Sequence, residues 1–401
     1  MHFDSLASRR VASAALAIAV LGLLAFGVVG LARGSNVHFE DVRYFFLAGK
    51  LTTAGVSPYD VAAFQAAALR YGLGPEIDVF AYPPHSLALC VPLSWLPVET
   101  ARWAWTVLNI GILVGTALAM GLRYEHRIGP RRDSAPSVAA LWIAAIIIGN
   151  PFAAHLIWTA QTGLMVMLCL LLAWHFEKRG RWVLAGVLLG LATMKPHLAL
   201  LALAWFVMTG SWRMVAVAIA TSALLLLFAF AQIGTEVMAQ WLSATLAYED
   251  QFVGSSYNTN LKSLLMGLGV ALPKGFTALM FALALSGVVA LARLHHRAPL
   301  AQHDVQALLL TTSLFLVQGR DYDLAVLAPL VPMWFWYARG NRWAIGAGLA
   351  ALVLLCIPHR GLAQSGLPAL PYYRIVILGA FWLWAASALA PARASAARGA
   401  S

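Results

Sequence analysis

The chain has few charged residues for its length. Only 11% of its 401 residues are Asp, Glu, Lys or Arg, whereas soluble globular proteins carry about 25%. So few charges cannot cover a water-exposed surface, which excludes two or three soluble domains of ordinary size. Hydrophobic residues make up 61% of the chain. We therefore interpret it as a polytopic integral membrane protein.

Cysteine is also scarce. The three cysteines, Cys90, Cys169 and Cys356, lie in separate apolar stretches and form no CxxC motif or Cys/His cluster. This spacing favours small buried hydrophobic residues over a disulfide or a metal site. We expect no metal and no cofactor.

Long apolar stretches are abundant, and about 20 apolar residues suffice to cross the hydrocarbon core as a helix. The sequence predicts an all-α bundle of about twelve transmembrane helices in a single domain, residues 1–390. Residues 391–401, rich in Ala, Ser and Arg, are typical of a disordered tail. The stretch 86–96 is too short for a span and is interpreted as interfacial or re-entrant. The predicted spans are 11–31, 103–121, 137–155, 163–176, 182–194, 198–208, 214–232, 276–292, 305–318, 324–338, 343–357 and 371–390.

The distribution of charge predicts the orientation. When the N-terminus is placed in the cytoplasm, the entire net charge of +11 falls on cytoplasmic segments, and the other side is balanced. The positive-inside rule favours this topology, with both termini cytoplasmic and the long loop 32–102 outside the cytoplasmic (inner) membrane. The basic residues are spread thinly over short turns, which excludes nucleic acid as a partner.

The loop 32–102 predicts two helices at the membrane surface. Aromatic and aliphatic residues recur at helical spacing over 39–53, which predicts an amphipathic juxtamembrane helix, and a second short helix is predicted at 61–71. Glu40 and Asp41 stand where the first helix begins. One of them could cap that helix, or it could be a functional carboxylate held just outside the bilayer.

Polar corners between apolar spans also face the outer side. Lys195 lies between two spans, where a charge is costly unless it has a partner, so a function is favoured. Arg320 precedes Asp321-Tyr322-Asp323, and a structural salt bridge to either carboxylate is an equal alternative. Because these corners meet at one face of the membrane, we expect their polar residues to converge.

A set of short motifs occurs in fixed order along the first outer loop and the span after it. The motifs are Asp41, Tyr44, Phe45, Ala48, Leu51, Gly55, Pro58-Tyr59-Asp60, Phe80, Tyr82-Pro83-Pro84, Pro92, Leu96-Pro97 and Asn109. This set resembles glycosyltransferase family 87, polyprenyl-phosphate-mannose-dependent mannosyltransferases of the membrane-embedded GT-C class. The resemblance is densest over 36–110 and extends loosely to Gln161-Thr162-Gly163, Lys195-Pro196 and the late outer loop. It implies a GT-C-like fold in which Asp41 is the catalytic base.

The resemblance implies transfer of a hexose, mannose in the family, from a polyprenyl-phosphate donor to a lipid or glycan acceptor. The reaction would be an inverting single displacement at the outer face. It needs a base beside the acceptor hydroxyl and positive charge near the departing phosphate. Membrane lipids are the other expected partners. Besides Asp41, the predicted site consists of Lys195 and Arg320 at the donor phosphate, and of Tyr44, Gln161, Asn258, Asp321, Asp323 and His197 lining the pocket.

Three alternatives remain open at this stage. Asp321-Tyr322-Asp323 resembles the DxD signature that holds a metal-bound nucleotide sugar, but pairing with Arg320 or binding of sugar hydroxyls is favoured. A flippase or transporter of lipid-linked saccharides, or a polysaccharide ligase or polymerase, would share the polytopic composition. Phe45 and the Arg-Asp-Tyr-Asp sequence depart from the family pattern, which leaves the acceptor and the sugar undecided.

Overall fold

The computed structural model of the chain describes residues 6–32, 41–73, 79–128, 137–251, 254–339, 341–355, 357 and 370–389. In these ranges the chain is helical apart from its connecting turns and one isolated β-bridge, between Asn258 and Arg320. The prediction of an all-α fold is confirmed. The elements are α1 (Leu6–Ala32), α2 (Asp41–Thr53), α3 (Val61–Arg70), η2 (Pro84–Ser86), α4 (Leu87–Ser94), α5 (Val98–Ile128), α6 (Val138–Ile148), α7 (Pro151–Trp158), α8 (Gly163–Lys178), α9 (Trp182–Ala192), α10 (Pro196–Met208), α11 (Trp212–Ile233), α12 (Val237–Gln251), α13 (Leu261–Gly267), α14 (Phe276–Arg297), α15 (Gln302–Thr312), η3 (Ser313–Val317), η4 (Asp321–Leu327), α16 (Leu330–Ala338), α17 (Arg342–Leu355), η5 (Leu370–Tyr372) and α19 (Tyr373–Ala388).

Several of these helices are able to span a membrane. In the described ranges, four are long and apolar enough to do so: α1, α5, α11 and α14. The pair α6 and α7, bent by 42° at its junction, would make a fifth if it forms one span. The chain is therefore a membrane protein. Each of the twelve predicted ranges contains helix in its described residues, but the count of about twelve spans stays a prediction because several of the helices are short.

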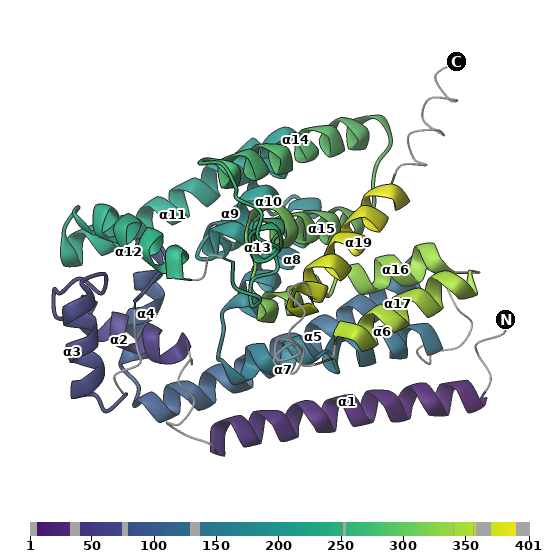
Figure 1. Cartoon of the computed structure of the whole chain (residues 1–401), viewed down its shortest axis with the longest axis horizontal. Helices are drawn as coiled ribbons and strands as arrows, with labels where there is room; N and C mark the ends of the chain where they lie inside the picture. Colours follow the sequence, from purple (N-terminus) through teal and green to yellow (C-terminus); the bar gives the residue numbers. More distant parts are fainter. Residues whose placement is uncertain are drawn as a thin grey trace.

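The long helices expose apolar side chains on the outside of the bundle. Ile18 on α1, Leu122 on α5, Leu224 on α11 and Leu283 on α14 are all exposed. In Figure 1, α1 runs along the bottom of the molecule and α14 along the top. Apolar side chains that point outward from peripheral helices suit a lipid environment rather than water.

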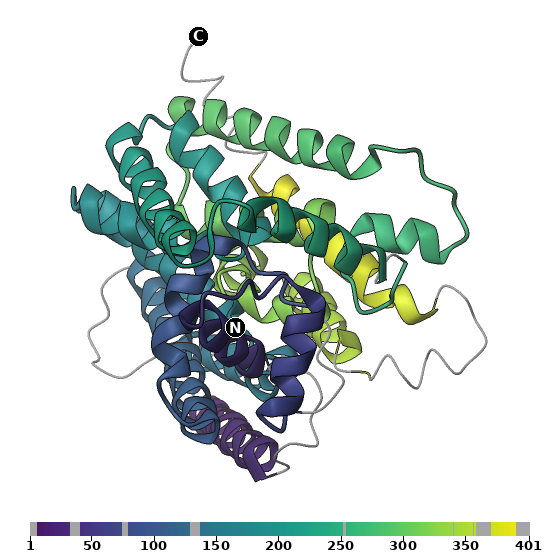
Figure 2. The ribbon, with the colours of Figure 1, turned by 90° about the vertical axis from the view of Figure 1, so that its left-hand side faces the viewer.

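The helices of the first long loop gather at one end of the bundle. Figure 1 shows α2, α3, α4 and α12 together at the left, whereas α1 begins and α19 ends at the right. Figure 2 views this left-hand end from the front. Helices α2 and α3 lie close to the predicted ranges 39–53 and 61–71, and Gly55, at a φ of 72°, follows the end of α2. Glu40 and the tail 391–401 lie outside the described residues, and the orientation in the membrane stays a prediction.

Close helix packing depends on small residues at one contact. Gly186 and Gly190 on α9 face α11, and a Cβ atom on either would lie 2.6 Å from the carbonyl oxygen of Met214 or 2.8 Å from that of Ala218. Spaced four residues apart, the two glycines lie on one face of α9 and let the two backbones approach closely. This packing fixes α9, and with it the turn that leads to α10.

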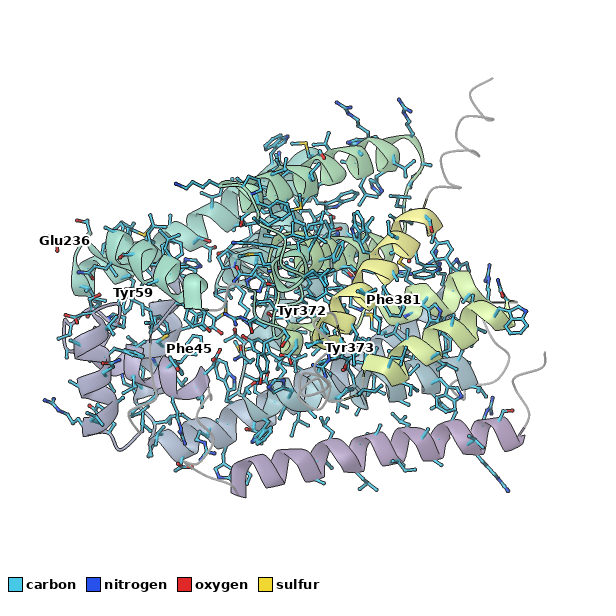
Figure 3. All side chains as sticks on the ribbon, viewed as in Figure 1. Phe45, Tyr59, Glu236, Tyr372, Tyr373 and Phe381 are labelled. Atoms are coloured by element: carbon cyan, nitrogen blue, oxygen red, sulfur yellow. The ribbon has the colours of Figure 1, made fainter. Side chains whose placement is uncertain are left out.

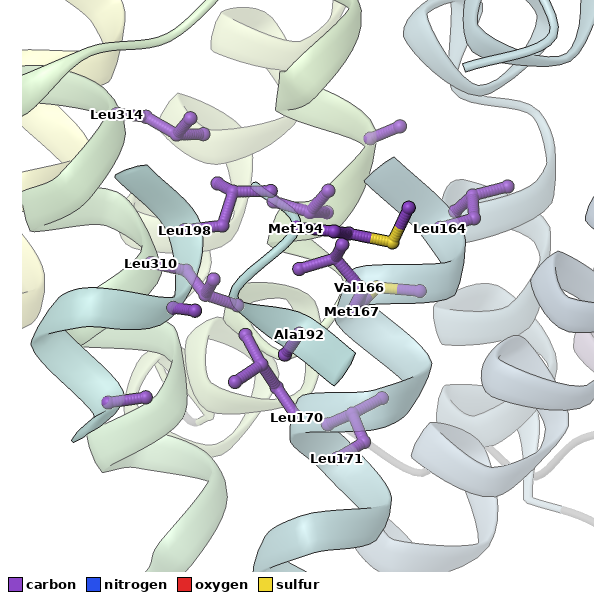
Figure 4. Close-up of a cluster of buried hydrophobic side chains, with 14 of the residues drawn as sticks. Leu164, Val166, Met167, Leu170, Leu171, Ala192, Met194, Leu198, Leu310 and Leu314 are labelled. Atoms are coloured by element: carbon purple, nitrogen blue, oxygen red, sulfur yellow. The ribbon is translucent and has the colours of Figure 1, made fainter. Parts of the chain in front are cut away.

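A buried apolar cluster supports the helix ends that carry the polar corners. Figure 4 shows Leu164 and Met167 of α8, Leu198 of α10, Leu310 of α15 and Leu314 of η3 in this cluster. All five side chains are buried. Because side chains in such an interior interdigitate tightly, the turns at the ends of these helices hold fixed positions relative to one another.

Candidate functional site

Four helix ends from distant parts of the chain converge on one polar group. Asp41 is the first residue of α2, Gln161 lies in the turn between α7 and α8, Lys195 is the N-cap residue of α10, and Asp323 lies in η4. Figure 3 draws the side chains of the whole bundle and labels Phe45 on α2 and Tyr373 at the start of α19. The structure thus brings together polar corners that the sequence predicts to meet at one face.

Local sequence explains why these turns form where they do. Asn150 caps α7 by accepting a hydrogen bond from the NH of Phe152, and Pro151 stands at the first position of that helix. Ala160, at a φ of 52°, adopts the left-handed conformation directly before Gln161. Strained backbone of this kind often occurs at functional sites. Pro196 begins α10 and so places Lys195 at the turn.

Lys195 and Asp323 form the centre of the group. The Nζ atom of Lys195 lies 3.0 Å from Oδ1 of Asp323 and donates a second hydrogen bond, of 3.2 Å, to Oε1 of Gln161. His197 Nε2 lies 3.4 Å from the other Asp323 oxygen, which also accepts a hydrogen bond from the backbone NH of Arg320. Burial by itself raises the pKa of Asp323, but the charge of Lys195 and the contact with His197 outweigh it and hold that pKa below its ordinary value.

Asp41 is held at the edge of this centre. Its backbone NH donates to the carbonyl of Thr159 at 2.9 Å, and its Oδ2 atom accepts a hydrogen bond from the hydroxyl of Tyr82. Burial raises the pKa of Asp41 to about 6, although the charge of Lys195 and the Tyr82 hydrogen bond both act to lower it. Part of Asp41 stays accessible to solvent. A carboxyl group with a pKa near neutrality is well suited to accept a proton at physiological pH.

A second ion pair adjoins the first. Arg374, at the start of α19, lies 3.2 Å from Oδ2 of Asp321, and His155 Nδ1 lies 3.7 Å from Oδ1 of the same carboxylate. The ring of Phe152 lies 5.0 Å from the guanidinium of Arg374. The two carboxylates of the Asp-Tyr-Asp sequence are therefore paired with Arg374 and Lys195. Their pairing with Arg320 or with sugar hydroxyls stays a prediction.

The remaining predicted residues lie around this centre. Arg320 pairs by a β-bridge with Asn258, and its guanidinium lies 5.3 Å from the ring centroid of Tyr248. The side-chain amide of Asn258 donates to the hydroxyl of Ser263 at 3.0 Å. The backbone of Asn258 therefore pairs with that of Arg320, while its side chain is anchored to α13 through Ser263. Tyr44 packs against Phe64 of α3, with ring centroids 5.9 Å apart.

An apolar cavity of about 310 Å³ begins beside the second ion pair. Three elements contribute both to the ion pair and to the wall of the cavity. The ion-pair residues on these elements are His155 of α7, Asp321 of η4 and Arg374 of α19. The same elements contribute Phe152, Leu324, Leu378 and Phe381 to the cavity wall. Parts of α1, α6, α16 and α17 complete the wall. The lining of this cavity is apolar, and its wall residue Phe152 lies under the guanidinium of Arg374.

Sequence reasoning missed Tyr82, Thr162 and Arg374 as members of the site. Tyr82 and Thr162 stand in the motifs that resemble the family, so the motifs themselves carried a signal for them. Arg374 gave no comparable signal, because a basic residue at the start of an apolar helix is usually an interfacial anchor. In the described ranges, no three His, Cys, Asp or Glu side chains are grouped so that they could hold a metal ion.

The described residues form an all-helical membrane protein with buried carboxylate–cation pairs at its helix turns. Ionisable groups buried in this way are typical of functional sites in membrane proteins. The chain belongs to glycosyltransferase family 87, whose sequence profile matches residues 80–319. This confirms the resemblance in the sequence and makes the protein a glycosyltransferase. Asp41 and the residues after 319 lie outside the matched range. No curated protein sequence is significantly similar to the chain.

Proposed function

We propose that the protein transfers a hexose, mannose by resemblance to its family, from a polyprenyl-phosphate sugar to a hydroxyl of a lipid or glycan acceptor. The transfer takes place at the outer face of the cytoplasmic membrane, without a metal. The observation that carries the proposal is the position of Asp41 beside the buried Lys195–Asp323 pair. Asp41 is partly exposed as a residue, and burial of its carboxyl group raises its pKa to about 6.

The reaction is an inverting single displacement. The acceptor oxygen forms a bond to the anomeric carbon of the sugar while the bond from that carbon to the phosphate oxygen breaks. Asp41 takes the proton of the acceptor hydroxyl, and the polyprenyl phosphate leaves with the electron pair of the broken bond. One carboxylate is enough for this chemistry, because no covalent sugar–enzyme intermediate forms.

Positive charge beside the departing phosphate completes the proposal. Lys195 and Arg320 are the expected phosphate partners. Arg374 adds a third cation, which lies over the ring of Phe152 in the wall of the apolar cavity. The prenyl tail of the donor occupies that cavity, because it is too apolar to leave the membrane and enters sideways from the bilayer. Gln161, His197, Asn258, Tyr44 and the Asp321–Asp323 segment line the pocket for the sugar and the acceptor.

The test is an assay of purified protein in lipid nanodiscs with radiolabelled polyprenyl-phosphate mannose and a panel of lipid and glycan acceptors. Asp41→Asn should lower turnover by about 10²–10⁴-fold and retain donor binding, because a general base acts on the chemical step. Asp60→Asn is the matched control. Asp60 lies in the same long loop, is exposed and caps α3 through Oδ1, a role that Asn also fills.

Three results would contradict the proposal. Near-normal transfer by Asp41→Asn would place the base elsewhere, with Glu40 and Asp321 the next residues to test. Transfer from a nucleotide sugar but not from any polyprenyl-phosphate sugar would refute the class of donor. Movement of a lipid-linked saccharide across the bilayer without a new glycosidic bond would favour a flippase instead.

A further inference from the structure

Tyr82 makes the closest contact with Asp41 and has no role in the function proposed so far. Its hydroxyl lies between Oδ2 of Asp41 and the hydroxyl of Thr162, which is 3.1 Å away. A phenol has one proton to donate, and an ionised carboxylate can only accept. The Tyr82 proton therefore points to Asp41, and Thr162 in turn donates to the Tyr82 oxygen.

The ring of Tyr82 is fixed from several directions. Its centroid lies 4.6 Å from that of Phe45 and 5.7 Å from that of Phe80. The backbone carbonyl of Tyr82 accepts a 2.6 Å hydrogen bond from the hydroxyl of Tyr59. Pro83 follows directly in the chain, and the proline ring restricts the backbone of the residue before it. The Tyr82 hydroxyl is thus presented by a rigid aromatic group rather than by a mobile loop.

The electrostatic surroundings keep Tyr82 as the donor and Asp41 as the acceptor of this hydrogen bond. Burial and the nearby Asp41 carboxylate raise the pKa of Tyr82 well above its ordinary value, so the phenol stays protonated. The hydrogen bond also acts to lower the pKa of Asp41. Two other titratable groups change the pKa of Asp41: Lys195 lowers it and Asp323 raises it. The charge of Asp41 in turn raises the pKa of Tyr322.

We propose that Tyr82 is a positioning residue for the catalytic base: it occupies one oxygen of Asp41 and thereby fixes which oxygen remains to receive the proton of the acceptor. This inference rests on the proposed function, in which Asp41 is the base. Thr162 belongs to the same chain of hydroxyls and orients Tyr82. A carboxylate held in this way keeps one rotamer when the acceptor arrives, which matters because small misplacements of a catalytic group are costly in rate.

The test is the pH dependence of turnover for Tyr82→Phe. Loss of the hydroxyl should lower kcat about 10- to 100-fold, because a hydrogen bond to a charged, partly buried group is lost. In the wild type we expect the acidic limb of the kcat profile near pH 6, where Asp41 titrates. In Tyr82→Phe this limb should move to higher pH, because the hydrogen bond that lowers the pKa of Asp41 is gone. The KM for the donor should change less than about threefold, since a positioning role acts on the chemical step.

Two further variants make the result specific. Thr162→Val should shift the acidic limb in the same direction by a smaller amount. In this variant Tyr82 still donates to Asp41 but no longer accepts the hydrogen bond from Thr162. Tyr71→Phe changes the exposed C-cap residue of α3 and should leave both kcat and the acidic limb unchanged. Each variant is checked for folding by thermal unfolding in detergent. If Tyr82→Phe does not fold, the shift of the acidic limb in Thr162→Val tests the inference instead, and an unmoved limb there would overturn it.

Three outcomes overturn the inference. Wild-type kcat and an unmoved acidic limb in Tyr82→Phe would show that Asp41 needs no such contact. A fall in kcat with an unmoved limb would show that Tyr82 acts only through packing. The third is normal transfer by Asp41→Asn, which would show that Asp41 is not the base and would also remove the role of Tyr82. This outcome is measured separately, so a failure of the proposed function can be distinguished from a failure of the inference about Tyr82 alone.

Discussion

The buried pair of Lys195 and Asp323 can be tested for a structural and a functional role at the same time. Both side chains are at most 5% exposed, and their charged atoms lie 3.0 Å apart. At an effective dielectric constant of about 20, two unit charges at that distance attract by roughly 5 kcal/mol. In Lys195→Met this attraction is lost, whereas His197 and the backbone NH of Arg320 still contact the carboxylate.

We expect Lys195→Met to lower the free energy of unfolding by about 3–5 kcal/mol, because the change leaves one buried charge without its main partner. The loss should depend on pH. Without Lys195 the pKa of Asp323 should rise, because burial then has less to oppose it. We therefore expect the variant to lose stability relative to the wild type as the pH rises and Asp323 becomes charged. In the wild type the pKa is lowered, so the contribution of Asp323 is present above its ordinary pKa and is lost as the pH falls.

The double variant Lys195→Met/Asp323→Asn separates stability from donor binding. Both charges are absent, so most of the stability should return, and a double-mutant cycle gives the coupling. Donor binding should remain weakened if Lys195 holds the phosphate. The measurements are denaturant unfolding in detergent and equilibrium binding of polyprenyl-phosphate mannose.

A loss of less than about 1 kcal/mol in Lys195→Met, or a double variant no more stable than the single one, would refute this reasoning about the buried pair. Normal donor binding by the double variant would show that Lys195 does not bind the donor phosphate, and Arg320 and Arg374 would then be the candidates for that role.

Three other expected outcomes test the remaining proposals. In a background without other cysteines, Ala66→Cys should react with a membrane-impermeant maleimide from the outer side, and labelling only from the cytoplasmic side would reverse the topology. Val331→Trp, at the cavity wall, should raise the KM for long-chain polyprenyl donors about tenfold or more and spare donors with a shortened tail. Leu224→Trp on the exposed face of α11 is its control, and equal effects of the two would show that the tail lies elsewhere. Chelation with EDTA should leave transfer unchanged, and loss of activity that Mg²⁺ or Mn²⁺ restores would show that a metal is needed.

The sequence by itself determined the features that depend on local composition and order. Apolar stretches of sufficient length predicted the helices, because a backbone in lipid has to satisfy its own hydrogen bonds. Gly55 and the aromatic spacing before it predicted α2 and its end. The motifs around Asp41 and Tyr82 predicted the family, and the polar corners at Gln161 and Lys195 predicted where side chains would converge.

Only the tertiary structure decided which polar groups are partners. Lys195 contacts Asp323 across 128 residues of sequence, Tyr82 contacts Asp41 across 41, and Arg374 contacts Asp321 across 53. No local pattern determines such a choice, since every cation near the outer face could in principle pair with either carboxylate of the Asp-Tyr-Asp sequence. The choice follows from the packing of α8, α10, α15 and α19, which sets the distance and the burial of each pair and so the strength of its interaction.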